Sequence, residues 1–316
     1  MMVPSGATML RVLAVVAVLA LTACGGKEAA TPAEAKLDLD SDPLALLPSS
    51  AVVVANLDAK AMFASASVGA ELSTLAGSLL PLGAEAGFDA KRDVDRVVLG
   101  VYTSTGADAV AVVSGRFDPA KIAATTQSRS GAAIVHAMYA GRDTYTAGPA
   151  MYSVLTAKTL VAGTGDAVRR LLDRVQDGKI ERAVPAWVAE TLSTPGAQLA
   201  LTADFTSQPV AIAAIGAVPT PWLTGIRVAK VIGNFDKRLN VAATMSYGEP
   251  MEAEGAADGV RTADVWLKLL GGLLGGISVK DLEVTTEGKD MKCKFAVDDQ
   301  TLGRVLAFAS HLLGAP

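Results

Sequence analysis

Residues 94–114 read VDRVVLGVYTSTGADAVAVVS, and this stretch decides the fold class that we expect. β-Branched and other apolar residues flank the turn residues Thr103-Ser104-Thr105-Gly106, a pattern that predicts a β-hairpin. Two further hairpins are predicted downstream, over residues 226–247 and around a turn at residues 287–290. Because hairpins join neighbouring antiparallel strands, the prediction is an α+β fold of mostly antiparallel sheets with helices packed on one face.

The same order of predicted elements occurs twice in the 316 residues. Each half has a strand before its hairpin, at residues 51–57 and 197–205, and each ends with a strand followed by a helix. We therefore predict two diverged tandem repeats of similar β-α-β-β-α-β topology, residues 51–195 and 196–316. The alternative is one mixed α+β domain whose elements happen to alternate. Helices are expected at residues 59–80, 119–125, 167–175 (capped by Asp166), 209–218, 262–274 and 300–313.

An apolar run near the N-terminus, Val12–Leu21, follows the cation Arg11 and leads into Leu21-Thr22-Ala23-Cys24-Gly25. The run has half of the roughly 20 residues that a membrane-spanning helix needs, and its layout is that of a secretory signal. The stretch around Cys24 resembles the lipobox of bacterial lipoproteins, and the resemblance covers residues 1–26. The alternative is an ordinary signal-peptidase cut after Ala23, which would release a free periplasmic protein.

The lipobox resemblance implies a signal peptide over residues 1–23, diacylglycerol on the sulfur of Cys24 and usually a third acyl chain on its amine. Two or three chains hold a protein to a membrane far more firmly than the reversible binding that one chain provides. The implied location is the cell envelope, with the body of the protein facing the periplasm. Gly25 replaces the aspartate that commonly retains lipoproteins at the inner membrane, which favours the outer membrane.

Residues 24–50 are predicted to form a flexible, acyl-anchored tether, because residues 27–50 have little apolar content and contain three prolines. The acidic run at residues 38–42 lacks the glycine and distal glutamate of an EF-hand, so we interpret it as a solvated linker. Without residues 1–23 the chain has 27 basic and 32 acidic side chains and no basic block. This mild acidity argues against a nucleic-acid partner and leaves the acyl anchor as the membrane contact.

No catalytic constellation is found in the sequence. The motifs H-E-x-x-H, G-x-S-x-G and S-x-x-K are absent, and the two histidines, His136 and His311, lie far apart. Cys293 shares a predicted strand face with Met291 and Phe295, which indicates a small buried hydrophobe rather than a reactive thiol. We therefore predict no catalytic residue, no cofactor and no metal site.

Two stretches of the sequence with few charged residues indicate a candidate binding site. Residues 209–223 contain no charged side chain, and residues 266–277 contain only Lys268. Such stretches are normally buried, so packing between the halves is one interpretation. The other is a groove for an acyl chain, a peptide or a partner protein. The side chains that would line this groove are Val210, Ile212, Ile215, Trp222, Leu223, Trp266, Leu270 and Leu273.

The sequence thus predicts a membrane-tethered, non-enzymatic envelope lipoprotein that binds or scaffolds an apolar ligand, a lipid or an envelope protein. One alternative is an envelope hydrolase of unfamiliar type, using carboxylates such as Asp93 or Asp299. A second alternative is a structural subunit of an envelope complex, with the charge-poor stretches as subunit interface.

Overall fold

β-Strands dominate the structure of this protein. The structure is a computed structural model, and it describes residues 38–65, 69–70, 72–73, 76, 82, 84–128, 131–210, 214–215, 218–219, 221–235, 238–270, 279–298 and 301–303. The strands are β1 (Val53–Leu57), β2 (Val94–Val101), β3 (Ala109–Gly115), β4 (Val135–Tyr139), β5 (Arg142–Ala147), β6 (Ala150–Val154), β7 (Thr159–Thr164), β8 (Leu199–Asp204), β9 (Ala214–Ile215), β10 (Val218–Pro219), β11 (Val228–Phe235), β12 (Leu239–Ser246), β13 (Val279–Glu287) and β14 (Asp290–Val297). The three predicted hairpins are all present, as β2–β3, β11–β12 and β13–β14.

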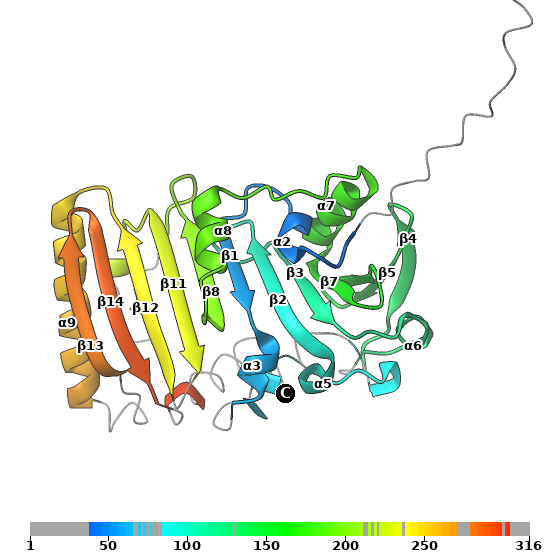
Figure 1. Cartoon of the computed structure of the whole chain (residues 1–316), viewed down its shortest axis with the longest axis horizontal. Helices are drawn as coiled ribbons and strands as arrows, with labels where there is room; N and C mark the ends of the chain where they lie inside the picture. Colours follow the sequence, from blue (N-terminus) through cyan, green and yellow to red (C-terminus); the bar gives the residue numbers. More distant parts are fainter. Residues whose placement is uncertain are drawn as a thin grey trace, which may run out of the picture. The chain divides into compact units, whose positions relative to one another are not determined.

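Twelve of the described strands form one antiparallel sheet, in the order β13-β14-β12-β11-β8-β1-β2-β3-β7-β6-β5-β4 (Figure 1), and β9 pairs with β10 alone. Near the middle of the sheet, β1 from the first predicted half pairs with β8 from the second, and Ala55 lies opposite Leu201. The α+β class with antiparallel strands is confirmed. A single sheet runs through both predicted halves, and Leu39–Pro316 group into one unit.

Helices pack on both faces of this sheet, so the prediction of helices on one face is wrong. The helices are α2 (Pro43–Leu46), α3 (Ala59–Phe63), α5 (Ala90–Asp93), α6 (Pro119–Ala124), α7 (Gly165–Gln176), α8 (Ala186–Leu192) and α9 (Pro250–Leu270), with 3₁₀ turns η1 (Ala84–Ala86) and η2 (Pro221–Leu223). On β7, Val161 belongs to the core cluster of Leu171 in α7, whereas Leu160 belongs to that of Ile122 in α6. Successive strand residues point to opposite faces, so both sides of β7 are covered.

We name the two faces of the sheet after their longest helices. The α7 face is covered by α2, α7 and α8, which share one core cluster with Val54, Val98 and Val112. The α9 face is covered in the first half by α3, α5 and α6 and in the second half by α9. The strand register places Val97 and Val53 on the same side, so the two clusters of the α9 face lie side by side on one face.

The longest helix, α9, starts at Pro250, well before its predicted start at residue 262. Ala253, Ala256 and Ala257 on its first turns are buried in the cluster of Met291 on β14. Alanine is only weakly apolar, so this face does not stand out in the sequence, yet small side chains allow the helix to lie close to the sheet. No helix in the described part of the chain, α9 included, has both the length and the apolar character needed to cross a bilayer.

Two local predictions are wrong. The helix expected over residues 209–218 is contradicted by β9 and β10, which lie within or directly after it. Short apolar runs do not distinguish strand from helix by periodicity alone, and here strand pairing prevails. Asp166 is not the cap of α7: Thr164 holds that position, and Asp166 instead pairs with Arg169 at 3.3 Å within the first turn.

The end of the predicted tether is packed against the sheet. Residues 39–47, which we call the strap, bury Leu39, Leu44, Leu46 and Leu47 in the cluster of the α7 face. Asp40 Oδ1 accepts a hydrogen bond from Thr159 Oγ1 at 2.7 Å, next to β6 and β7. The prediction of a flexible tether out to residue 50 is therefore wrong from Leu39 onward, because four buried leucines offset the entropy lost on ordering the segment.

Candidate functional site

One part of the α7 face carries exposed polar side chains instead of a buried core. On β14, Lys292 and Lys294 point to this face and are exposed, whereas Met291 and Cys293 point to the α9 face and are buried. On β13, Glu283 is exposed on the same side as Lys294. We call the α7 face of β11, β12, β14 and β13 the open face. It lies next to α8 and the loop that leads from α8 into β8 (Figure 1).

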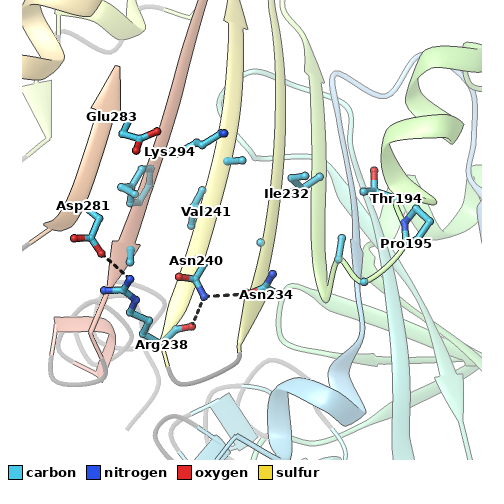
Figure 2. A pocket seen from close by; sticks show the side chains of 16 residues that line it. Thr194, Pro195, Ile232, Asn234, Arg238, Asn240, Val241, Asp281, Glu283 and Lys294 are labelled. Atoms are coloured by element: carbon cyan, nitrogen blue, oxygen red, sulfur yellow. Dashed lines mark hydrogen bonds and ion pairs between the residues drawn. The ribbon is translucent and has the colours of Figure 1, made fainter. Parts of the chain in front are cut away.

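The open face is hollowed into a groove of about 430 Å³ (Figure 2). One wall is the loop from α8 to β8, residues 194–197, and the floor consists of the strands. A single cross-strand row runs along the floor, because Ile232 lies opposite Ala242, Ala242 opposite Lys294 and Lys294 opposite Glu283. The groove therefore changes from apolar beside β11 to charged at β13. Its lining is completed by Gly233, Asn234, Arg238, Asn240, Val241, Asp281, Phe295 and Ala296.

The polar residues of the groove fall into a paired group and a free group. Arg238 and Asp281 form an ion pair of 2.6 Å, and Asn240 Nδ2 donates to Asn234 Oδ1 at 3.1 Å. Figure 2 shows Lys294 and Glu283 on the same side of the groove as the Arg238–Asp281 pair, away from Thr194. Neither of these two forms an ion pair with any residue that the structure describes. One cation and one anion are therefore available to a bound molecule.

Asp281 owes its position to an irregularity in β13. The pairing of β13 with β14 shifts register between Lys280 and Glu283, and the backbone of Asp281 has a φ of 51°. A bulge of this kind redirects a side chain out of the regular alternation. Here it brings the Asp281 carboxylate to the Arg238 guanidinium, and both residues line the groove.

The side chains of the groove belong to a few chemical types. The lining contains no histidine, serine or cysteine, and its carboxylates are those of Asp281 and Glu283. Among the residues that the structure describes, no group of His, Cys, Asp or Glu is arranged to hold a metal ion.

A second, more polar cavity of about 590 Å³ lies on the other side of the loop from α8 to β8. The two cavities share Thr194, Gly196 and Ala197 in their linings. The strap contributes Asp42, which pairs with Arg182 at 2.7 Å. The loop is therefore a common wall between two cavities on the α7 face.

The residues predicted to line an apolar groove lie on different elements of the structure. Trp222 and Leu223 lie in η2 and pack on the core cluster of α9, which corresponds to the core alternative of the prediction. A Cβ added to Gly259 of α9 would meet Trp222 Cε3 at 3.2 Å, so helix and indole are in close contact. Val210 is half-buried in the loop after β8. Ile215 lies in β9, Trp266 and Leu270 lie near the end of α9, and Cys24, Ile212 and Leu273 are outside the described residues.

The carboxylate of Asp93, a predicted catalytic candidate, is held by hydrogen bonds from its neighbours. It is buried, with 7% of its surface exposed, and accepts hydrogen bonds from Arg92 Nε at 2.8 Å and from the Asp89 amide at 2.9 Å. The bond from Arg92 holds the pKa of Asp93 below its ordinary value. A general acid needs a raised pKa, so this carboxylate is unsuited to that role. Asp299 lies outside the described residues.

Two further sequence predictions concern single side chains. His136 lies on β4, where it contacts Asp143 at 2.7 Å and stacks on Tyr145, so its contacts are with neighbouring strand residues. Cys293 is buried and free, as predicted, and burial raises the pKa of its thiol. A raised pKa lowers the thiolate fraction, which makes the sulfur less reactive.

No protein-family model matches the sequence, and no curated protein is significantly similar to it in sequence. Similarity is found in structure. Crystal forms I and III of a protein named TP0453 match with TM-scores of 0.50 and 0.51. The matches cover 84% of this chain and 96% and 97% of the TP0453 chain, at 13% and 12% identity. At this level of identity, the similarity concerns the fold alone.

Proposed function

We propose that this protein is a lipid-anchored, non-enzymatic protein of the bacterial cell envelope that binds a protein partner on its open face. The groove is the observation that carries the proposal. Its floor holds Ile232 and Ala242, and its rim holds the unpaired Lys294 and Glu283. Protein interfaces combine an apolar centre with a polar rim in this way. The lipobox around Cys24 supports the envelope location.

A protein partner fits this groove better than a free apolar ligand. Sites for small apolar ligands enclose most of the ligand surface and are lined mainly by apolar side chains. The groove is open on one side and its β13 end is charged, so a lipid chain would leave Lys294 and Glu283 facing hydrocarbon. A peptide segment supplies both apolar side chains for the floor and polar groups for the rim.

We further propose that the two halves are diverged tandem repeats. Reading outward from the pairing of β1 with β8, the strand order is β1-β2-β3-β7-β6 in one direction and β8-β11-β12-β14-β13 in the other. Each half thus starts at the centre, continues with its hairpin and places its last strand beside that hairpin. The hairpin β4–β5 is then an addition to the first half. Superposing β8, β11, β12 and β14 on β1, β2, β3 and β7 in an experimental structure tests this proposal.

Site-specific crosslinking in intact cells tests the binding surface. A photoreactive amino acid at position 294 should give a discrete crosslinked product with an envelope protein. The matched control places the same amino acid at position 251, because Met251 is 80% exposed on α9, at the other face of the sheet. Equal products from both positions, or none from position 294, would contradict the proposal.

The anchor has a separate test. A Cys24→Ser variant should lose incorporation of an alkyne-labelled fatty acid and should move from the membrane fraction to the soluble fraction. Membrane association that persists without label in the Cys24→Ser variant would contradict acyl anchoring. This outcome would leave the crosslinking test of the open face intact.

A further inference from the structure

The polar cavity beside the groove carries an inference that does not depend on the proposed partner binding. Its volume is about 590 Å³, and it lies where β1 and β2 meet the strap and the end of α8. Its charged lining residues are Asp42, Asp58, Arg96 and Arg182. The two acids and two bases make the lining neutral overall, and this balance favours a ligand that is itself neutral overall.

The two pairs of charged residues differ in their contacts. Asp42 and Arg182 neutralise each other in an ion pair of 2.7 Å. Asp58 directly follows β1, Arg96 lies on β2 next to the last pair of the two strands, Leu57 and Val97, and both residues line the cavity. Neither forms an ion pair with any residue that the structure describes. Asp58 Oδ1 accepts a hydrogen bond from the Ala61 amide at 2.9 Å, which leaves the second oxygen of this carboxylate available.

Asn56 on β1 also lines this cavity. Its Nδ2 donates to the carbonyl oxygen of Leu192 at 2.9 Å, which sets the orientation of the amide. The other atom, Oδ1, is buried and has no hydrogen-bond partner. The amide therefore has a fixed position in the wall of the cavity, and its oxygen presents almost no surface to a bound molecule.

We propose that this cavity binds a small zwitterion of the α-amino acid class. The Arg96 guanidinium is placed to bind the ligand carboxylate, with the planar geometry that suits this group. The free oxygen of the Asp58 carboxylate is placed to accept a hydrogen bond from the ligand ammonium. Ammonium and carboxylate lie on one carbon in an α-amino acid, which matches a cation and an anion presented side by side. A simple anion or a simple cation would satisfy only one of the two.

Thermal denaturation of the full chain with single amino acids tests the proposal. At millimolar concentrations, at least one of the common free α-amino acids should raise the melting temperature, because a ligand that binds only the folded state stabilises it. For an amino acid that raises the melting temperature, calorimetry should then compare three compounds. The amine that lacks the carboxylate and the acid that lacks the amino group should each bind at least about tenfold more weakly than the amino acid. No shift with any amino acid, or equal binding of the three compounds, would overturn the inference.

Two variants and a control link the binding to this cavity. Arg96→Gln and Asp58→Asn should each abolish the shift while leaving the melting temperature of the free protein nearly unchanged. Asparagine caps a helix as well as aspartate does, so the start of α3 is preserved in the second variant. Arg238→Ala, in the neighbouring groove, is the matched control and should bind as the unmodified protein does. Unchanged binding in both cavity variants would also overturn the inference.

Discussion

Strands β7 and β14 hold corresponding places in the two halves of the sheet but have opposite surroundings. Each is the last described strand of its half and lies beside the hairpin of that half. The first four residues of β7 are buried, and helices cover both of its faces. On β14 buried and exposed residues alternate from Met291 to Lys294, because α9 covers one face and no other described helix packs on these residues. The difference shows that a sheet with a complete core on one side can leave polar side chains exposed on the other.

The largest expected effect tests this difference in burial directly. On β7, Leu160→Ala should lower the free energy of unfolding by about 2–5 kcal/mol and Val161→Ala by about 2 kcal/mol. The two substitutions leave cavities on opposite faces of the sheet. On β14, Met291→Ala should cost about 2–5 kcal/mol, whereas Lys294→Ala should change stability by less than about 0.5 kcal/mol. Urea unfolding with a common m-value measures all four variants. A cost above about 1 kcal/mol for Lys294→Ala would mean that the open face is covered in solution.

Filling the groove should affect binding and spare folding. Ala242→Arg places a long side chain on the floor between Ile232 and Lys294. Partner capture by the photoreactive residue at position 294 should fall about tenfold or more, which corresponds to about 1.4 kcal/mol. Thr285→Arg, on β13 outside the groove lining, is the control and should capture normally. If both arginine variants captured the partner equally well, the groove would not be the binding surface.

The contacts of the strap should make the stability of the protein depend on pH in the acidic range. Burial alone would raise the pKa of Asp40, but hydrogen bonds from Thr156 and Thr159 and the charge of Lys158 outweigh it and lower the pKa. A carboxylate with a lowered pKa in the folded state stabilises the protein above its unfolded-state pKa, and this contribution is lost as the pH falls through the folded-state value. Asp40→Ala should therefore cost about 1 kcal/mol at pH 7, a modest value because Asp40 is exposed to screening solvent.

The difference in stability between Asp40→Ala and the unmodified protein should shrink below about pH 4. Urea midpoints measured at neutral and acidic pH give this comparison. Asp95→Ala is a suitable control, since Asp95 is exposed and its ion pair with Lys60 is 4.0 Å long. A difference that stayed constant with pH would show that packing, and not charge, holds the strap.

The smallest expected effect lies at the border between the covered and open parts of the α7 face. Lys230 Nζ on β11 lies 5.3 Å from the ring centroid of Trp187 in α8. Lys230→Ala should cost about 0.5–1 kcal/mol through the lost cation–π contact, whereas Lys230→Arg should be nearly neutral. Thermal denaturation resolves the two variants. Equal loss in both would assign the effect to the lysine stem rather than to its charge.

The predictable parts of the fold are those whose signals are local. The hairpin in residues 94–114 forms β2 and β3, because β-branched runs around a turn suffice to specify it. The strap was missed since the acidic residues around Leu39 dominate the composition of a short segment, while its leucines gain their stability only from the distant residues of α7. The start of α9 was missed for a similar reason, because buried alanines are recognised by their neighbours in space and not by their own hydropathy.

The candidate site was predictable only in fragments. The alternation Met291-Lys292-Cys293-Lys294 already indicates a strand with one buried and one exposed face. It does not indicate that Ile232 and Thr194, far away in the sequence, complete a groove around Lys294. The polar cavity gave no signal at all, because Asn56, Asp58 and Arg96 are ordinary strand-end residues until the pairing of β1 with β2 brings them together.

The sequence by itself determined the secondary structure of the hairpins, the antiparallel α+β class and the resemblance of its N-terminal segment to a lipobox. Each of these depends on residues that are neighbours in the chain. Only the tertiary structure decided that one sheet joins both halves and that helices cover both faces of the first half. It also decided that, among the described residues, one face of the second half carries exposed polar side chains. Those features depend on which strands pair and which side of each strand a helix reaches, and these are set by packing between residues that are far apart in the chain.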